Sequence, residues 1–163
     1  MRNLFLLGMK YLPAEIITPT GLVVNLGAGN SPIPGTISLD YPKWNAESDS
    51  LPFEDNSLDG IYAFHFLEHL SGVHVIKLLA DMQRKLKIGG VATFGTPHRL
   101  GSMAYHDLDH KTFWSEDTFK NLFKNPYYDK NREQPWNFSI RFNMIMGLNE
   151  RNLILFTQLQ RTS

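Results

Sequence analysis

Two glycines and one carboxylate are the first residues whose types and spacing suggest chemistry. Gly27-Ala28-Gly29 directly follows a short apolar run, and glycine at such a turn lets backbone amides approach a ligand that a Cβ would push away. Asp40 and Tyr41 end the next apolar run, where a carboxylate can accept two hydrogen bonds from a ribose diol and an aromatic ring can pack on a purine. The pattern suits a nucleoside ligand, although Asp40 and the glycines could equally serve only the turns in which they lie.

The segment after the glycine turn argues against a bound diphosphate. A dinucleotide fingerprint would need a third glycine three residues on and a full helix before the next strand. This chain has Pro32 in that place and Pro34 shortly after it, and only residues 30–35 separate the turn from the next apolar run. These residues are too few and too rich in proline for more than one turn of helix. A nicotinamide oxidoreductase is therefore disfavoured.

A histidine-rich stretch forms the second group, with His98 followed by His106, Asp107 and His110. Three interpretations remain open. As catalysts, His98 or His110 could take a proton from an oxygen or nitrogen nucleophile while Asp107 orients the ring. As metal ligands, His106, Asp107 and His110 offer suitable donor atoms, but the set is too incomplete to assign an ion. As loop residues, they would satisfy their own backbone, with the following aromatic pair anchoring the loop.

Composition excludes several classes of protein. The chain has 163 residues, 42% hydrophobic and 20% charged, with 16 Lys and Arg against 16 Asp and Glu, which describes one soluble domain over residues 1–163. It has no cysteine, so disulfides, thiolate zinc sites, iron–sulfur clusters and cysteine nucleophiles are excluded. No apolar run approaches the roughly 18 residues that span a bilayer, and we expect a cytoplasmic protein without a membrane partner. Zero net charge without a Lys and Arg patch disfavours nucleic acid.

Short apolar, β-branched runs predict the strands that would position these residues, at 22–26, 36–39, 60–64 and 91–94. Such runs, separated by crossovers, indicate a mostly parallel sheet covered on both faces. Ligands bind beyond the carboxyl ends of the strands in sheets of this kind. We therefore expect His65 and the histidine-rich loop to face one crevice.

Helical spacing predicts a helix over residues 72–86 and a second helix after Ser115. Residues 138–146 and 153–159 are predicted to form an antiparallel strand pair that closes the sheet edge. Three polar residues beside or within the first helix are expected to have structural, capping or surface roles: Glu68, His69 and His74.

Four segments of the chain lie at residues 25–30, 51–59, 65–70 and 86–90. In their order and spacing they resemble motifs of the class I S-adenosylmethionine-dependent methyltransferases, in particular of small members similar to methyltransferase type 11. The resemblance implies an α/β fold, a Rossmann-like methyltransferase sandwich with a mostly parallel sheet and an antiparallel C-terminal strand pair. The first crossover helix is curtailed in this chain. S-adenosyl-L-methionine is the implied cofactor.

The resemblance also implies roles for nine residues around that cofactor: Asn25, Gly27, Ala28, Gly29, Asp40, Tyr41, Asn45, Ala46 and His65. The glycine turn would lie against the methionine part, Asp40 would bind the ribose hydroxyls and Tyr41 would pack on adenine. Asn45 and Ala46 would recognise the adenine amino edge, and His65 would contribute backbone to the methionine end. Asn25 stands where the family usually carries an acidic residue, so backbone carbonyls would recognise the ammonium group.

The predicted activity is in-line methyl transfer to a small-molecule, sugar-like or exposed terminal acceptor, with His98, His110 and Asp107 as candidate catalytic residues. Cytosine C5 methylation is excluded because it needs a cysteine. Methylation of exocyclic amino groups in DNA is disfavoured because residues 65–68 lack the pattern it requires. The alternative is a catalytically inactive S-adenosylmethionine-binding regulatory or assembly module, which Asn25 and the missing first helix favour. Breakdown of the sulfonium without an acceptor is a further possibility, and the oligomeric state is left open.

Overall fold

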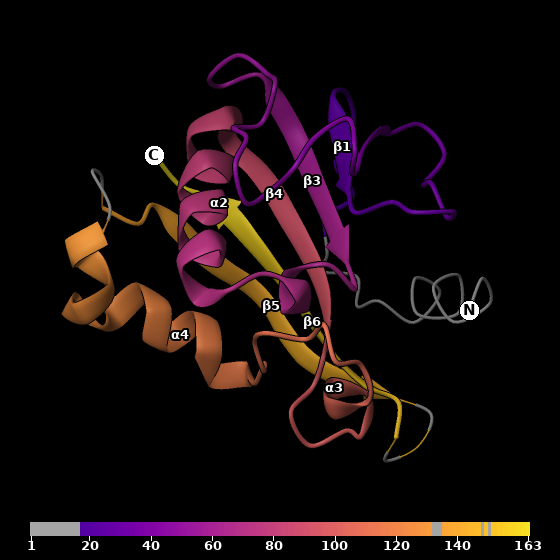
Figure 1. Cartoon of the computed structure of the whole chain (residues 1–163). Helices are drawn as coiled ribbons and strands as arrows, with labels where there is room; N and C mark the ends of the chain where they lie inside the picture. The colour runs from indigo at the N-terminus through magenta and orange to yellow at the C-terminus, as the bar shows by residue number, and fades with distance from the viewer. Residues whose placement is uncertain (1–16, 132–134, 148, 150) are drawn as a thin grey trace.

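A six-stranded sheet is the frame of the computed structural model, which describes residues 17–131, 135–147, 149 and 151–163. The strand order is β2-β1-β3-β4-β6-β5 (Figure 1). The strands are β1 (Val23–Leu26), β2 (Ile37–Leu39), β3 (Leu58–Phe64), β4 (Leu86–Pro97), β5 (Phe138–Gly147) and β6 (Leu153–Arg161). All six strands that the apolar runs predicted are present, and β4 begins five residues earlier than the predicted 91.

Strand directions confirm the predicted fold class. β1 pairs in parallel with β2 and β3, and β3 pairs in parallel with β4. β6 lies antiparallel between β4 and β5. The long apolar run of β4 is buried from residue 90 to 97 because the strand lies in the middle of the sheet. The result is the mostly parallel sheet with an antiparallel C-terminal pair that the sequence predicts.

The connection from β1 to β2 contains no helix, as predicted. Gly27 N–H donates to the carbonyl of Leu39 at 2.9 Å, which extends the parallel pairing of β1 and β2 to the first residue of the glycine turn. Two short turns follow, closed by Ser31 N–H to Ala28 O at 2.9 Å and Thr36 N–H to Ile33 O at 3.2 Å. Proline lacks the N–H that a helix would need here, and the curtailed crossover leaves the carboxyl ends of β1 and β2 uncovered by a helix.

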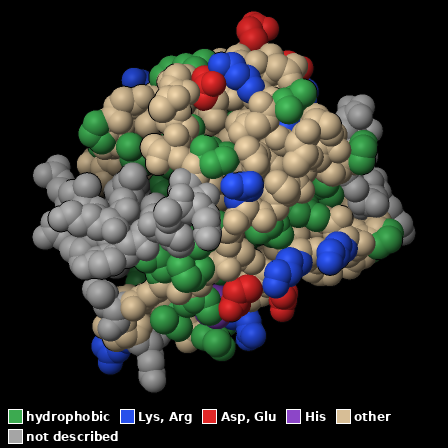
Figure 2. All heavy atoms as spheres, turned by 180° about the vertical axis from the view of Figure 1, so that it is seen from behind, with side chains coloured by type: hydrophobic (Ala, Val, Ile, Leu, Met, Phe, Trp, Pro, Cys, Tyr) green, Lys and Arg blue, Asp and Glu red, His purple; other side chains and the backbone are tan. Residues whose placement is uncertain are grey.

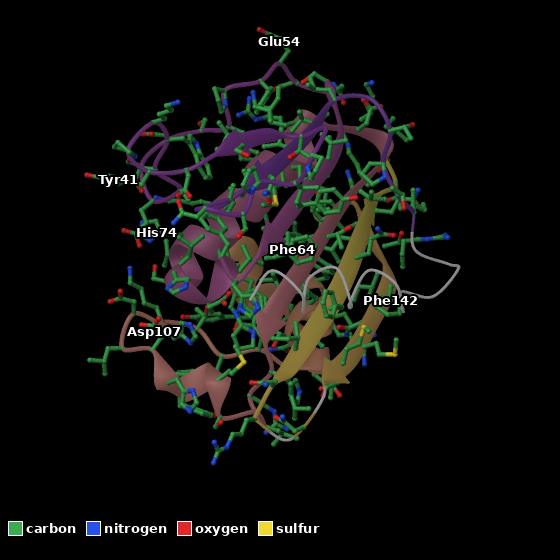
Figure 3. The ribbon with its side chains drawn as sticks, turned by 90° about the vertical axis from the view of Figure 1, so that its right-hand side faces the viewer. Tyr41, Glu54, Phe64, His74, Asp107 and Phe142 are labelled. Carbon is green, nitrogen blue, oxygen red and sulfur yellow. The ribbon has the colours of Figure 1, made fainter. Side chains whose placement is uncertain are left out.

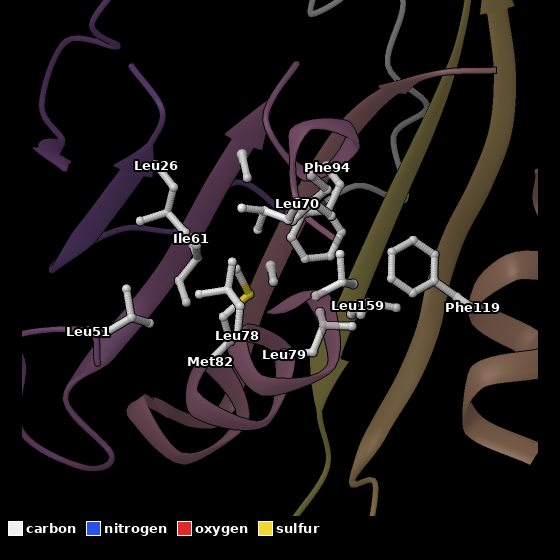
Figure 4. Close-up of a cluster of buried hydrophobic side chains, with 14 of the residues drawn as sticks. Leu26, Leu51, Ile61, Leu70, Leu78, Leu79, Met82, Phe94, Phe119 and Leu159 are labelled. Atoms are coloured by element: carbon white, nitrogen blue, oxygen red, sulfur yellow. The ribbon is translucent and has the colours of Figure 1, made fainter. Parts of the chain in front are cut away.

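Two helices cover one face of the sheet: α2 (Gly72–Lys85) and α4 (Glu116–Lys124). Leu79 and Met82 of α2 are fully buried in the same cluster as Phe94 of β4 (Figure 4). Phe94 stacks on Phe119 of α4, with ring centroids 5.5 Å apart, so both helices share this face. The shorter elements are η1 (Leu67–His69), α3 (Met103–His106) and η2 (Pro126–Asn131). None of the described helices is long and apolar enough to cross a membrane.

The opposite face of the sheet carries aromatic side chains. Tyr62 and Phe64 stack with ring centroids 5.7 Å apart, and Phe64 contacts Phe156 at 6.2 Å. The backbone of Ile17 exchanges two hydrogen bonds with the side chain of Gln158 on this face. The sequence predicted that both faces of the sheet would be covered. Within the described residues, however, the helices α2 and α4 cover only one face. Figure 2 shows Lys and Arg side chains scattered over the back of the molecule, with Asp and Glu among them, rather than one basic patch.

Candidate functional site

A pocket of about 530 Å³ opens beyond the carboxyl ends of the parallel strands. The loop after β2 supplies most of its wall, and η1 with the loop after α3 supplies the rest. Its lining residues are Asp40, Tyr41, Trp44, Asn45, Ala46, Glu47, Phe66, His69, Leu70, Asp109 and Lys111. This is the edge of an open α/β sheet where ligands are expected, and four of the nine residues predicted to hold the cofactor line it.

The glycine turn is joined to Asp40 by a hydrogen bond. Gly29 N–H donates to Asp40 Oδ2 at 2.7 Å, and Tyr41 N–H donates to Oδ1 at 2.8 Å. These bonds hold the carboxylate beside the turn, and each oxygen keeps a further lone pair for a ligand hydroxyl. Gly29 has φ +49° and a Cβ there would meet nothing within 4 Å, so the turn faces open space.

Gly27 has a different environment from Gly29. Its φ is +63°, and an added Cβ would overlap the ring of Phe66. Phe66 follows β3 and lines the pocket. The ring therefore packs directly on the bare backbone of the turn, and this close approach requires glycine. Ala28, between the two glycines, is buried.

An aromatic wall completes this part of the pocket, and sequence reasoning missed it. The ring of Trp44 is 4% exposed and its centroid lies 6.2 Å from that of Phe66. Trp44 Nε1 donates to the carbonyl of Ser50 at 3.1 Å, which fixes the indole. The only signal in the sequence was a tryptophan four residues after Asp40, because its ring contact is with Phe66, which is distant in the chain.

The residues predicted to recognise adenine lie on the loop after β2. Asn45 begins a tight turn in which its Oδ1 accepts from Glu47 N–H at 3.0 Å and its N–H donates to Asp49 Oδ2 at 2.9 Å. The hydrogen bond from Asn45 lowers the pKa of Asp49. Ala46 lines the pocket beside it. Tyr41 is 77% exposed at the rim, and Figure 3 shows it on the same side of the molecule as His74 and Asp107.

Five of the predicted cofactor residues do not line the pocket: Asn25, Gly27, Ala28, Gly29 and His65. Asn25 is buried within β1. His65 follows β3 with φ +51°, and its N–H donates to Gly95 O at 2.8 Å. Its half-exposed ring places Nδ1 3.3 Å from Oε1 of Glu68.

The three candidate catalytic residues lie in different environments. His98 is 1% exposed, its Nε2 lies 3.0 Å from Glu116 Oε2, and its Nδ1 accepts from Leu100 N–H at 3.4 Å. The exposed Asp107 accepts from Asp109 N–H at 3.0 Å, within its own loop. Only His110 approaches the pocket, because its ring meets that of His69 edge to face with centroids 4.8 Å apart.

Glu68, His69 and His110 form a cluster that the sequence analysis did not predict. One donor atom from each lies within 4.8 Å of the others. Glu68 and His69 belong to η1, whereas His110 comes from the loop after α3. Lys111 N–H and Thr112 N–H both donate to the backbone carbonyl of Glu68, at 2.7 and 3.1 Å, so the loop is docked on η1. No local pattern signals this cluster because its members are about 40 residues apart.

An ion pair crosses the same side of the pocket. Lys111 Nζ lies 2.8 Å from Glu47 Oε1, and the hydrogen bond from Lys111 lowers the pKa of Glu47. His74 Nδ1 lies 3.7 Å from the same carboxylate oxygen. The loop after β2 and the loop after α3 are therefore connected through their side chains.

Comparison with known proteins agrees with this arrangement. Residues 27–94 match the family model of a methyltransferase domain. Similar solved structures include an S-adenosylmethionine-dependent methyltransferase from Mesorhizobium loti, at 14% identity over 91% of this chain and 94% of that chain, with a TM-score of 0.62. A second, from Archaeoglobus fulgidus, is 15% identical over 99% of this chain and 95% of that chain, with a TM-score of 0.63.

A third similar structure is phosphoethanolamine N-methyltransferase 1 of Haemonchus contortus in complex with phosphoethanolamine and S-adenosylhomocysteine. It is 14% identical over 90% of this chain and 41% of that chain, with a TM-score of 0.62. No curated protein matches the chain. At these identities the structural likenesses establish a shared fold, and the family match covers the glycine turn, Asp40 and η1.

Together these findings show a match to a methyltransferase domain over residues 27–94 and a fold shared with S-adenosylmethionine-dependent methyltransferases, proteins whose cofactor is S-adenosyl-L-methionine. The pocket fits that cofactor. Space is open where a Cβ of Gly29 would stand, Asp40 offers lone pairs to a sugar diol, and Trp44 and Phe66 provide an apolar wall.

Proposed function

We propose that the chain transfers the cofactor's methyl group to a small-molecule, sugar-like or exposed terminal acceptor by in-line displacement. The observation that carries this proposal is the 2.7 Å hydrogen bond between Gly29 and Asp40 at the pocket of about 530 Å³. That bond holds a carboxylate and an open glycine turn side by side. The volume lies within the range of small-molecule sites.

The cofactor's position follows from the residues around the turn. Asp40 accepts hydrogen bonds from the ribose hydroxyls, and Gly27 to Gly29 lie against the methionine part. Tyr41, Asn45 and Ala46 surround the adenine, with Trp44 beneath it. His65 and Asn25 act through their backbone near the methionine end. In this proposal each role rests on the place of the residue relative to the pocket.

The acceptor binds on the side formed by η1 and the loop after α3. His69, Asp109 and Lys111 line the pocket there, and they offer polar groups to a hydroxyl-bearing or amine-bearing molecule. The leaving sulfur needs no proton, so the main task of these residues is to align the acceptor in a cleft with little water. Of the two candidate catalytic histidines, His110 is better placed to reach the acceptor, because the ring of His98 is buried against Glu116.

The test is calorimetry with S-adenosylhomocysteine on Asp40→Ala. The expected loss of affinity is about 1–3 kcal/mol, because a hydrogen-bonded carboxylate is removed. Asp117→Asn is the matched control: its carboxylate lies on α4, is 85% exposed, and should leave affinity unchanged. Equal affinity in Asp40→Ala and the parent protein would remove the ribose assignment.

A screen of acceptors with labelled cofactor tests the transfer itself. Turnover of a hydroxyl-bearing or amine-bearing small molecule is the expected result, detected by mass spectrometry of the product. Cofactor binding without turnover on any acceptor would instead support the alternative of an inactive binding module. Label released without an acceptor would indicate breakdown of the sulfonium.

A further inference from the structure

We propose that Glu68, His69 and His110 bind a divalent transition-metal ion at the wall of the cofactor pocket, where the ion holds an oxygen-bearing acceptor. The role in acceptor binding rests on the proposed methyl transfer, whereas the metal site rests on the cluster alone. The donor set differs from the His106, Asp107 and His110 set that the sequence suggested. It consists of two imidazoles and one carboxylate, the set found in several catalytic metal sites.

The burial of Glu68 is the first argument. This side chain is 1% exposed, and among the described residues neither carboxylate oxygen has a hydrogen-bond partner. The ring of His65 lies 3.3 Å from Oε1, a contact without hydrogen-bond geometry. Buried charges are normally paired or coordinate metals. A cation between Glu68 and the two histidine rings would supply the missing partner.

The orientation of His110 is the second argument. Its Nδ1 lies 3.0 Å from the backbone carbonyl of Ala104. A carbonyl can only accept, so Nδ1 carries the proton and Nε2 of the neutral ring has a free lone pair. Metal-binding histidines commonly donate their other ring nitrogen in this way, which fixes the ring and its tautomer. His110 is therefore held as a ligand would be.

Backbone hydrogen bonds hold the two halves of the cluster together. The carbonyl of Glu68 accepts from Lys111 and Thr112, and Thr112 Oγ1 donates to Leu67 O at 3.1 Å. The three donor atoms lie within 4.8 Å of one another. Two ligands about 2.1 Å from one tetrahedral ion lie about 3.4 Å apart. Binding therefore draws the widest pair together by about 1.4 Å, a movement that side-chain torsions accommodate.

The ion's remaining coordination positions suit an acceptor oxygen. His69 lines the pocket, so an ion bound to its ring adjoins the same space as the cofactor. A metal-bound hydroxyl has a lowered pKa and releases its proton to water. Its oxygen then bonds to the methyl carbon as the carbon–sulfur bond breaks, and the electron pair goes to sulfur to form S-adenosylhomocysteine. Oxygen acceptors are therefore favoured over amines.

The test is calorimetric titration of the chelator-treated full chain with Zn²⁺ alone. We expect one ion per chain, and binding weakened by more than about 100-fold in Glu68→Gln and in His110→Ala. Mg²⁺ at equal concentration should not compete, because imidazole ligands favour softer ions. Circular dichroism checks that each variant is folded. If His110→Ala does not fold, the nearly isosteric Glu68→Gln decides the question.

Two control variants separate this cluster from other histidine sites. His74→Ala removes a ring near the pocket that lies outside the cluster. His106→Ala removes an exposed ligand of the set suggested by sequence. Both should bind Zn²⁺ as the parent protein does. Equal loss of affinity in His106→Ala and Glu68→Gln would overturn the proposed ligand set, and so would undiminished binding in folded Glu68→Gln.

The outcomes distinguish this proposal from the methyltransferase proposal. S-adenosylhomocysteine binding to the metal-free chain tests the cofactor site independently of the ion. Cofactor binding without any Zn²⁺ binding overturns the metal site and leaves the transferase assignment standing. Zn²⁺ binding that changes no acceptor turnover overturns the ion's role in acceptor binding. A rise in turnover of a hydroxyl acceptor when Zn²⁺ is restored is the expected result.

Discussion

At the residue scale, the two glycines of the turn are constrained in different ways. Gly27 lies under the ring of Phe66, whereas the Cβ position of Gly29 faces open space. Both have positive φ, so any other residue has a backbone cost of roughly 1–2 kcal/mol. Of the two, only Gly27 adds a steric overlap with a neighbour, the partly buried ring of Phe66.

We therefore predict different effects of alanine at these positions. Gly27→Ala should destabilise the fold by about 2–5 kcal/mol, since overpacking adds roughly 1–3 kcal/mol to the backbone cost. Gly29→Ala should cost only about 1–2 kcal/mol, and it should weaken cofactor binding because its strained backbone disturbs the hydrogen bond that holds Asp40 beside the turn. Urea unfolding and calorimetry with S-adenosylhomocysteine measure the two effects. Equal destabilisation by both substitutions would contradict the contact with Phe66.

At the element scale, the pair of His98 and Glu116 joins the end of β4 to the first turn of α4. Two hydrogen bonds lower the pKa of Glu116. The larger effect comes from the backbone N–H of Glu116 itself, and the second comes from the side chain of His98. A carboxyl group whose pKa is lower in the folded state stabilises the fold above its unfolded pKa. That stability is lost as the pH falls through the lower folded value.

Glu116→Gln should therefore reduce the free energy of unfolding at pH 7 by about 0.5–1 kcal/mol, a modest value because this side chain is 41% exposed. The difference from the parent protein should shrink below the usual carboxyl pKa of about 4.3 and vanish at lower pH. Urea unfolding at several pH values measures it. Asp117→Asn, in the same helical turn, is the control for general charge effects, and a similar pH dependence in both variants would contradict the role of His98.

At the scale of the whole molecule, the pocket joins segments that are distant in the chain. The loop after β2, η1 and the loop after α3 meet there, and the Glu47–Lys111 ion pair links two of them. A ligand in this pocket contacts all three segments and binds only the folded chain. Its binding free energy is therefore added to the stability of the fold.

S-adenosylhomocysteine at 100 times its dissociation constant should raise the free energy of unfolding by about 2.7 kcal/mol. Thermal unfolding with and without the ligand measures this effect. NADH at the same concentration is the negative control, because the curtailed first crossover offers no helix for a diphosphate. A shift with NADH and none with S-adenosylhomocysteine would contradict the assigned cofactor.

Local patterns in the chain were enough to predict most of the fold. The apolar run of β1, the helical spacing of α2 and the turn before β6 depend on neighbours within a few residues. Pro32 and Pro34 likewise predicted the missing crossover helix, because proline restricts its own backbone. The glycine turn and Asp40 were placed together correctly for a related reason: parallel neighbouring strands bring their carboxyl ends to one edge.

Three-dimensional packing was needed for the rest of the site. Trp44 became a wall of the pocket because Phe66 packs near it, and His98 was buried because α4 brings Glu116 to it. Glu68 and His110 meet although two helices and a strand separate them in the chain, and no periodic pattern in the sequence indicates such a contact. Side-chain chemistry depends on what each group faces, and for long-range neighbours that is known only once the chain is folded.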